Sequence, residues 1–405
     1  MRPPGAWPRP FSPFDGTAGP AALDHRGMRR LGLFVVLTLA WLSALHLVFR
    51  QDRAALVEPL LARTLAFWAA PGAERARLRS TNPEWDLMSR TFSVLAFANL
   101  ALERPARRDE LLRAIDAVLE DTLRADAAQE DAFVLPYFHR ASFRDRAARS
   151  LFLDGELALM LAARQSVAPD TRWAAPLRER ADRIAAQLER GPVLSGESYP
   201  DEAWTFCNTV ALAALALSDR VDGRDHAALR RRWLEVAKRR LVEPRTGLLI
   251  SSFTWDGAPL DGPEGSTLWL AAHMLQLVDE DFAREQYRRA REALGCTALG
   301  FAWAREWPAR LRGHDDVDSG PTIPLVDANA GSSGLAVLGA AAFGDRAYLD
   351  GLLASLAFAG FPRQRDGSLR FAAGNQLGDA VILYSLVQGP LWARAQPRLA
   401  AEARR

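Results

Sequence analysis

Beyond residue 50, the chain alternates between two kinds of helical pattern. In the first kind, apolar side chains recur every three or four positions and charged side chains cover the other face, which predicts a helix with one face in water. We expect such helices near residues 54–68, 107–124, 172–190, 225–241, 281–293 and 345–357. In the second kind, residues are apolar or small nearly all round, which predicts a helix buried on all sides. These segments are 91–102, 157–163, 207–217, 266–278, 334–343 and 379–387.

This alternation predicts an all-α fold. Six buried helices that alternate with six half-exposed ones are what a double ring of hairpins, an (α/α)6 toroid or barrel, requires. A helical-repeat solenoid is the alternative, but the sequence shows no fixed period that would support it. The alanine and glycine content of the buried segments suits close packing about a central axis.

The first fifty residues differ from the rest. Residues 1–27 are rich in proline, glycine and alanine without hydrophobic period, so we expect a disordered tail, and Met28 is a candidate for the true start. From Leu31 to Phe49 no formal charge occurs apart from the one that His46 can carry, and this length is enough to cross a bilayer as a helix. The sequence therefore predicts a transmembrane anchor over 28–50, followed by a catalytic domain over 51–400.

The charges that flank this segment favour one orientation. Arg26, Arg29 and Arg30 precede it, which places the N-terminus in the cytoplasm and the main domain in the periplasm or otherwise outside. A cleaved signal peptide is the rival interpretation. No clear small-x-small cleavage site closes the apolar run, so we favour an uncleaved anchor.

Composition excludes several classes of protein. The 51 basic and 49 acidic side chains nearly cancel, which leaves no strong field to attract nucleic acid. Two cysteines, Cys207 and Cys296, are too few for a disulfide framework, although a single bridge stays open. The chain holds no HExxH, GxSxG, GxGxxG or CxxC pair, so we expect no metal and no cofactor. The oligomeric state stays open, a homo-oligomer included.

Polar loops precede the buried helices. They cover residues 80–86, 152–156, 194–202, 260–266, 305–321 with 329–334, and 370–379. If the inner helices are parallel, as in a toroid, their N-termini open at one end and these loops meet at one mouth. Residues 246–260 fit either a short β-hairpin at this rim or a plain loop.

The loops supply acidic and aromatic side chains to this mouth. Several carboxyl groups in an apolar cavity can be driven apart in pKa, which suits general acid and base catalysis on a neutral or sugar-like substrate. The acids are Asp86, Glu156, Asp201, Glu264, Glu306 and Asp318, and the aromatic residues are Trp85, Tyr199, Trp204, Trp269 and Trp307. His273 lies inside a buried helix, where it fits a hydrogen-bonded core histidine or a binding residue.

Each candidate also has a purely structural explanation. Asp201 and Glu264 stand where helix caps or first-turn acids belong. Cys207 in an apolar helix is equally explained as a small buried hydrophobe. The run 314–320, HDDVDSG, is either a solvated turn or an acidic metal-binding loop, although it lacks the spacing of an EF-hand.

The block 197–253 resembles the corresponding region of linalool dehydratase/isomerase. The resemblance consists of the Pro200–Asp201 pair, a CNTVA helix start six residues after Asp201, a DRVDGRD turn and an EPRTG loop after a tryptophan-bearing helix. A weaker parallel is the acidic loop 314–320. The resemblance implies an (α/α)6 barrel enzyme that adds or removes water at a monoterpene alcohol and shifts a double bond, with cysteines and acid/base residues in its pocket.

The resemblance also implies individual site residues. The family's cysteine in the CN pair matches Cys207, and its aspartate in the PD pair matches Asp201. The second pocket cysteine falls on Ser198, and the active-site histidine falls on Glu156, so the reaction is less certain to be shared than the fold. Cys296 lies elsewhere and does not replace the missing thiol.

Three functions remain to be separated. The first is a membrane-anchored, exported and cofactor-free lyase or isomerase acting on an apolar alcohol. In it Glu156 or Glu264 protonates a leaving hydroxyl, Asp201 takes a proton, and Tyr199 and Cys207 orient the oxygen. The second is a glycoside-processing (α/α)6 hydrolase with two carboxylates and a tryptophan platform. The third is a non-catalytic envelope binding module. A pocket lined by Leu, Met and Phe favours the first, an open groove floored by Trp the second, and acids that all cap helices the third.

Overall fold

The computed structural model describes residues 25–69, 72–128, 133, 142–309, 311, 319–320 and 322–396. These residues are mostly helical, as the alternating pattern predicts. The chain divides into two compact units, residues 1–45 and 46–405. Residues 1–24 of the predicted tail lie outside the described part, while His25, Arg26 and Gly27 begin the first helix.

Helix α1, His25–Val48, has the length and composition of a membrane span. It runs for 24 residues and buries none of its side chains. Within the described part of the chain it is the one helix that is long and apolar enough to cross a membrane. A signal sequence near an N-terminus has the same properties.

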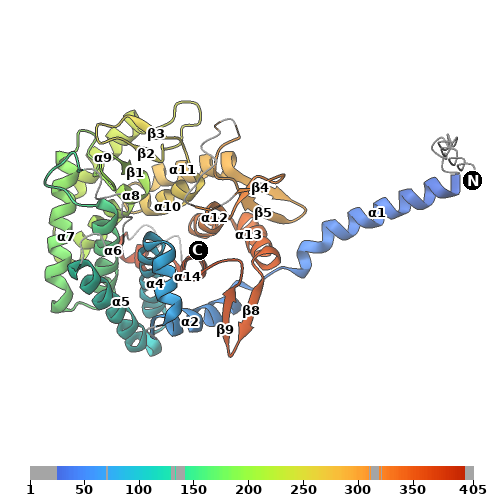
Figure 1. The fold of residues 1–405 in the computed structure, drawn as a ribbon, viewed down its shortest axis with the longest axis horizontal. Coiled ribbons are helices and arrows are strands. Elements are labelled where there is room, and N and C mark those ends of the chain that lie inside the picture. The colour runs from blue at the N-terminus through green and yellow to red at the C-terminus, as the bar shows by residue number, and fades with distance from the viewer. Residues whose placement is uncertain are drawn as a thin grey trace, which may run out of the picture. The chain divides into compact units, whose positions relative to one another are not determined.

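Six apolar helices form the centre of the second unit. They are α4 (Pro83–Glu103), α6 (Leu151–Val167), α8 (Thr205–Asp222), α10 (Gly265–Leu275), α12 (Ala330–Ala342) and α14 (Gln376–Val387). Each packs against the next in this order, and α14 also packs against α4 (Figure 1). Most of their residues are buried because every face meets another helix.

Amphipathic helices cover this centre from outside. They are α2 (Arg53–Ala69), α5 (Arg108–Ala128), α7 (Thr171–Arg190), α9 (Ala227–Arg240), α11 (Glu280–Leu294) and α13 (Arg346–Ala359). Helix α7 is typical, since it buries Trp173, Leu177, Ile184 and Leu188 at helical spacing and leaves its arginine-rich face in water. Helices α5, α7, α11, α13 and α2 pack on α4, α6, α10, α12 and α14 respectively.

Short elements complete the second unit. The remaining helices are α3 (Ala73–Thr81), η1 (Pro105–Arg107) and α15 (Pro390–Ala395). The strands are β1 (Ala203–Trp204), β2 (Ser252–Phe253), β3 (Pro259–Asp261), β4 (Gly295–Ala298), β5 (Phe301–Ala304), β6 (Thr322–Ile323), β7 (Ala328–Asn329), β8 (Pro362–Arg365) and β9 (Ser368–Phe371). They pair antiparallel as β1–β2–β3, β4–β5, β6–β7 and β8–β9. The β2–β3 pair shows that the hairpin, and not the plain loop, is the correct alternative for residues 246–260.

Several helices begin inside the loops predicted before them. Residues 152–156 were expected in a loop, but α6 begins at Leu151, where the Ser150 hydroxyl accepts a hydrogen bond from the Leu153 amide (3.4 Å). Gly155 is therefore no turn residue. A Cβ at this position would meet Ala211 and the Cys207 carbonyl at 3.4–3.5 Å, which is ordinary van der Waals contact, so Gly155 lies where α6 packs on α8. Similarly, Asn82 caps α4 and Pro83 is its first residue, which puts Asp86 inside the helix.

Candidate functional site

A cavity of about 840 Å³ lies at the N-terminal ends of the six apolar helices. Each of these helices lines it with residues from its start, which agrees with the expectation that the helix starts meet at one mouth. The residues that line the cavity include Glu84, Trp85, Met88, Phe152, Tyr199, Glu202, Trp204, Phe206, Cys207, Asp261, Glu264, Ser266, Glu306, Trp307, Leu335, Leu377 and Val381.

The lining combines carboxyl groups with aromatic and aliphatic side chains. Its acids are Glu84, Glu202, Asp261, Glu264 and Glu306. Its apolar part includes Met88, Phe152, Phe206, Leu335, Leu377 and Val381. An apolar cavity with a few converging polar groups is typical of a site for a small molecule.

Two aromatic side chains in the lining donate hydrogen bonds to acids. The Tyr199 hydroxyl donates to Glu84, the second residue of α4. The Trp204 indole donates to Glu202. Glu84 thus lies at the positive N-terminal end of α4 and accepts the hydrogen bond from Tyr199.

Glu306 has different surroundings. It follows β5, is 2% exposed and accepts hydrogen bonds at Oε1 from the Ser266 amide (3.3 Å) and the Ser266 hydroxyl, so that it caps α10 from outside. Its Oε2 has no hydrogen-bond partner among the described residues. Burial raises the pKa of Glu306 to about 7, although the bonds from Ser266 and the nearby Ser319 hydroxyl, which lies outside hydrogen-bond geometry, act in the opposite direction.

Glu156 lies behind the cavity wall, one turn along α6 from the lining residue Phe152. It is buried, and its Oε2 has no hydrogen-bond partner among the described residues. Burial raises the pKa of Glu156 to about 8, and a hydrogen bond with Thr91 offsets part of the rise. Glu156 is therefore largely protonated at neutral pH.

Cys207 lines the cavity beside Glu156. Burial raises the pKa of its thiol well above the ordinary value, a hydrogen bond with Ser198 opposes this, and the charges of Glu156 and Glu84 add to it. The thiol is thus neutral at physiological pH and is no ready nucleophile. Ser198, the position of the family's second cysteine, is in contact with Cys207.

The residue after Cys207 explains the CN pair. Asn208 accepts a hydrogen bond from the Gly196 amide (2.9 Å) and donates to the Gly196 carbonyl (3.1 Å). These bonds hold the loop 194–202 against α8. Tyr199 and Glu202 belong to this loop, so Asn208 fixes the place of two lining residues while Cys207 faces the cavity.

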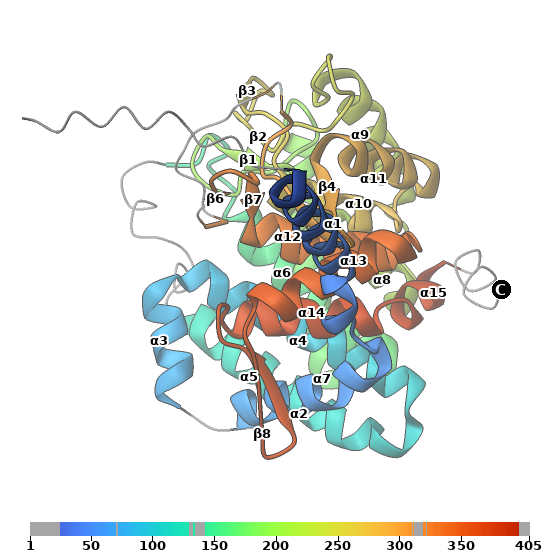
Figure 2. The same ribbon diagram turned by 90° about the vertical axis from the view of Figure 1, so that its right-hand side faces the viewer.

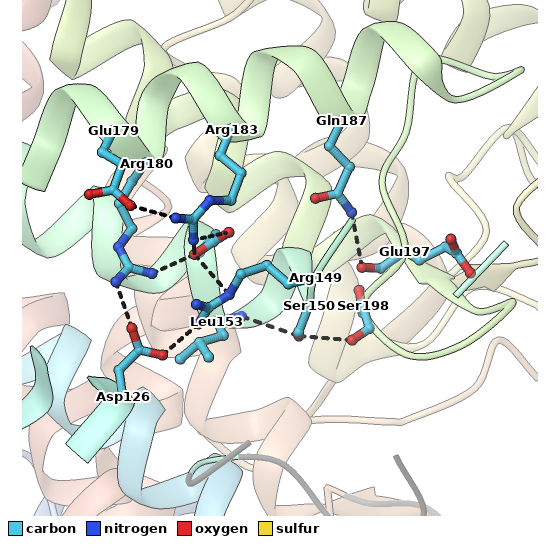
Figure 3. A network of polar contacts seen from close by, with 11 residues as sticks. Asp126, Arg149, Ser150, Leu153, Glu179, Arg180, Arg183, Gln187, Glu197 and Ser198 are labelled. Carbon is cyan, nitrogen blue, oxygen red and sulfur yellow. Dashed lines mark hydrogen bonds and ion pairs between the residues drawn. The ribbon is translucent and has the colours of Figure 1, made fainter. Parts of the chain in front are cut away.

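A buried ionic network lies at the start of α6 (Figure 3). Asp154 on α6 pairs with Arg180 (2.5 Å), Arg183 (3.2 Å) and Arg149 (3.4 Å). Arg180 also pairs with Asp126 of α5 (2.6 Å). The network joins α5, α6 and α7 and contains no member that lines the cavity, so its function is to brace the wall.

Hydrogen bonds between side chains and backbone hold Ser198 and Glu197 in place. The Ser150 hydroxyl donates to the Ser198 carbonyl (2.8 Å), and the Gln187 amide donates to the Glu197 carbonyl (3.4 Å) (Figure 3). The Glu197 carboxylate accepts from the amides of Arg144 (3.0 Å) and Asp201 (2.7 Å). The loop that carries Tyr199 is therefore held from several directions.

Asp201 is not among the residues that line the cavity. It occupies the left-handed position of a tight turn, φ 57°, in which Tyr199 and Glu202 exchange backbone bonds (2.9 and 3.0 Å). Proline and then aspartate suit the two centre positions of such a turn. The Asp201 carboxylate pairs with Arg144 (2.9 Å). The Pro200–Asp201 pair thus shapes the loop that presents its neighbours.

Three further predicted residues lie in the core away from the cavity lining. Asp86 is fully buried and pairs with Arg90 (3.2 Å). The Trp269 indole is buried and donates to the Ser332 hydroxyl (3.1 Å). The third is His273. The placement of these three side chains gives no support to the binding role expected from the sequence.

His273 is a satisfied core histidine. Its ring stacks on Trp392 at 4.7 Å, with Nε2 2.7 Å from the Tyr384 hydroxyl and Nδ1 3.0 Å from the Gln276 side chain. Burial lowers the pKa of His273 to about 3. Asp318, the last predicted residue, lies outside the described residues.

The predicted residues that do meet in the cavity are Trp85, Tyr199, Trp204, Cys207, Glu264, Glu306 and Trp307. The capping explanation for Glu264 does not hold for its side chain, which makes no cap bond although the residue precedes α10. Sequence reasoning missed Glu84, Glu202 and Asp261. The Asn82–Pro83 start signal could have revealed Glu84, because a helix from Pro83 puts Glu84, Trp85 and Met88 on one side and Asp86 on another.

Metal ligands do not gather in the described part of the chain. No group of three or more His, Cys, Asp or Glu side chains stands there in an arrangement that could hold an ion. Cys207 and Cys296 are both free thiols. The cavity therefore presents carboxyl, hydroxyl and indole groups as its chemical equipment.

Two comparisons with known proteins bear on this site. A family model described as linalool dehydratase/isomerase matches residues 153–377, more than half of the chain. A solved GH76 alpha-mannanase from Bacteroides thetaiotaomicron is 10% identical with a TM-score of 0.46, covering 78% of this chain and 87% of the mannanase. That likeness is too low to support an argument. The matched family region includes Cys207, Glu264 and Glu306, whereas Glu84 and Trp85 precede it.

Proposed function

The chain belongs to the linalool dehydratase/isomerase family, and on this premise we propose that it removes or adds water, or shifts a double bond, in a small apolar alcohol held in the cavity. One observation carries the proposal. Two carboxyl groups in different surroundings, the buried Glu306 with its raised pKa and Glu84 in the first turn of α4, line the same largely apolar cavity. Pairs of acids whose surroundings separate their pKa values are the usual means of assigning acid and base.

For the fold, we propose that the six apolar helices are the inner ring of an (α/α)6 barrel. The contact of α14 with α4, which joins the last of these helices to the first, supports this arrangement. The shared position of the six helix starts around the cavity supports it as well. In the proposed barrel the domain over residues 51–400 is catalytic and α1 is its membrane anchor, with the barrel outside the cytoplasm.

Glu306 is the general acid in this proposal. Its raised pKa keeps a proton available near neutral pH, and its Oε2 is not engaged by another described residue. The proton passes to the substrate hydroxyl, the carbon–oxygen bond breaks, and its electron pair leaves with water. Developing positive charge on carbon is stabilised by the faces of Trp85, Trp204 and Trp307, which line the cavity.

Glu84 is the general base. Its carboxylate takes a proton from the carbon next to the cationic centre, and the carbon–hydrogen electron pair becomes the double bond. This replaces the role expected for Asp201, whose carboxylate pairs with Arg144 instead. Tyr199 orients Glu84 through its hydrogen bond. The reverse sequence of proton transfers hydrates an alkene, and neither direction requires a redox cofactor.

Glu156, Cys207 and Glu264 support the reaction. Glu156 is mainly protonated at neutral pH, so it adds no negative charge to the cavity wall near Cys207. Cys207 and Glu264 are positioned to contact the substrate oxygen. The aliphatic and phenylalanine side chains of the lining favour an apolar alcohol over a glycan, which is the alternative substrate class for two carboxylates and tryptophans.

The test is turnover of a panel of tertiary and allylic alcohols and the matching alkenes, followed by gas chromatography with mass detection. We expect Glu306→Gln to lower kcat/KM by about 100-fold or more, because general acid catalysis typically contributes 10²–10⁴-fold. In the parent, kcat/KM of dehydration should fall as pH rises above about 7, where Glu306 loses its proton.

The matched control is Glu235→Gln, an exposed residue of α9, which should retain the parent rate. A folded Glu306→Gln variant that dehydrates every accepted alcohol at the parent rate would refute the role of Glu306. Turnover of oligosaccharides with none of the alcohols would refute the proposed substrate class.

A further inference from the structure

The exposed apolar side chains of the second unit are concentrated on three connected segments. Among the described residues after α1, every exposed large hydrophobic side chain except Leu260 belongs to them. We call this set the apolar face, and it consists of Leu299, Ile323, Leu325, Val326, Phe358 and Phe361. Concentration of this kind marks an interaction surface, whereas single exposed hydrophobic residues are ordinary.

Structural contacts join the three segments. The turn between β4 and β5 carries Leu299, and the turn between β6 and β7 carries Leu325 and Val326. The Trp303 indole of β5 donates to the Val326 carbonyl (2.8 Å). Strand β5 is also tied to α13, because the Tyr348 hydroxyl donates to the Trp303 carbonyl (2.8 Å). Figures 1 and 2 both place β4, α13 and β8 on one side of the second unit.

The backbone holds three of these side chains in an unfavourable conformation. Leu299, Leu325 and Phe361 have φ values of 50°, 72° and 50°, in the left-handed region that bulky residues rarely adopt. Each stands at a chain reversal where glycine or asparagine would be less strained. Their exposed fractions are 50%, full exposure and 65% respectively. Strain combined with exposure of an apolar side chain has no benefit for folding, so it points to a binding role.

The segment that follows α1 ends on this same face. Phe49 packs against Phe358 (ring centroids 5.1 Å) and Phe301 (6.3 Å). Four residues later, Arg53 pairs with Asp350 of α13 (2.6 Å). The point where the chain leaves the second unit towards a helix with the properties of a membrane span is therefore fixed beside the apolar face.

Basic side chains border the apolar face. Arg363 and Arg365 follow Phe361 directly on the exposed strand β8, and Arg370 is exposed on β9. Apolar and aromatic side chains flanked by arginine are the combination that binds the boundary between acyl chains and anionic headgroups.

From these observations we propose that the apolar face contacts the lipid bilayer, with its leucine and phenylalanine side chains at the acyl-chain boundary and the β8–β9 arginines at the headgroups. The occupant is lipid because Phe49 and Arg53, which closely follow a helix with the properties of a membrane span, are held beside this face. The β6–β7 hairpin carries Leu325 at its turn and is flanked in sequence by the cavity-lining residues Gly320 and Ala330.

The test uses the full chain reconstituted into phosphatidylcholine–phosphatidylglycerol vesicles. Single variants Leu299→Cys, Leu325→Cys and Phe361→Cys are labelled with a nitroxide, and its relaxation by oxygen, which partitions into lipid, is compared with relaxation by a water-soluble nickel chelate. We expect oxygen to be favoured over the chelate by several-fold at these positions. The matched control is Arg232→Cys on the exposed side of α9, and an unsubstituted chain measures labelling of Cys207 and Cys296.

The outcome is decided by the ratio between the two relaxation agents. Equal, water-like accessibility at Leu299, Leu325, Phe361 and Arg232 would overturn the proposal. Dipolar broadening between labels on different molecules, without contact to lipid, would identify a second copy of the chain as the occupant and would overturn it too. Neither result depends on the reaction proposed for the cavity, because the measurement involves no turnover.

Discussion

Replacement of Glu156 by glutamine tests the electrostatics of the cavity wall without knowledge of the substrate. The change keeps the shape of the side chain and removes its ability to ionise. The carboxyl group has an ordinary pKa of 4.5 and a pKa of about 8 in the folded protein, because it is buried. We expect Glu156→Gln to change the free energy of unfolding more favourably at neutral pH than in acid.

The sign follows from the two ionisation equilibria. Below pH 4.5 both the folded and the unfolded chain hold the proton, so the folded state loses nothing. Between pH 4.5 and 8 the unfolded chain ionises and the folded chain does not, so the free energy of unfolding falls by about 1.4 kcal/mol per pH unit. A pH of 7 lies 2.5 units above the ordinary pKa, so the free energy of unfolding is lower there by about 3 kcal/mol than in acid. Glutamine removes this loss.

The assay is urea unfolding of the full chain in detergent, followed by tryptophan fluorescence at pH 4.5, 6 and 7.5. The difference in free energy of unfolding between Glu156→Gln and the parent should grow in favour of the variant as the pH rises. Glu235→Gln on the exposed face of α9 makes the same chemical change in water and should show no such trend. A difference for Glu156→Gln that is the same at all three pH values would refute the reasoning, because it would mean that Glu156 ionises alike in both states.

Two further predictions concern groups that support the site or the core. Asp154→Asn should lower the free energy of unfolding by about 3–5 kcal/mol, since it leaves Arg180 and its neighbours buried without their carboxylate. Asp182, which pairs with Arg224 on the surface, is the control, and Asp182→Asn should lower the free energy of unfolding by less than about 1 kcal/mol in the same urea titration. Burial lowers the pKa of His273 to about 3, so between pH 6.5 and 5 only the unfolded chain takes up a proton at this residue. Acidification over this range should therefore lower the parent's free energy of unfolding by about 2 kcal/mol. A His273→Gln variant should lack that part of the acid sensitivity, and an unchanged slope between pH 6.5 and 5 would contradict it.

The pattern of apolar and polar positions was sufficient to predict the arrangement of helices. Of the six segments expected to be buried, four lie wholly within α4, α6, α8 and α14, and the other two begin in α10 and α12 and end one to three residues beyond them. Those expected to be half-exposed coincide with α2, α5, α7, α9, α11 and α13. This works because burial on one face or on all faces leaves a clear mark on composition at helical spacing. The resemblance at the CN pair likewise led to the correct family.

The individual site residues were harder to predict, because small shifts in helix starts change which side chains reach the cavity. Glycine in the segment 152–156 indicated a turn, but Gly155 lies inside α6 where this helix packs on α8, so Glu156 belongs to the second turn of a helix and lies behind the wall. Trp269 and His273 lie one and two turns into α10 and are turned into the core. For all three residues the sequence predicted the correct helix, but it did not predict which face of the helix the side chain lies on.

The same geometry explains why the proposed base is Glu84 and not one of the acids that were expected. Once Asn82 and Pro83 begin α4, the positions of Glu84, Trp85 and Met88 fall on the side of the cavity, and Asp86 falls on the side of Arg90. One residue of displacement along a helix is a rotation of about 100°, which is enough to move a carboxylate from the substrate to the core. Asp201 is displaced for a different reason, since the left-handed turn that it makes presents Tyr199 and Glu202 in its place. The site therefore depends on where each apolar helix begins, and acids close to a helix start in the sequence become catalytic candidates only when the cap residue before them has been identified.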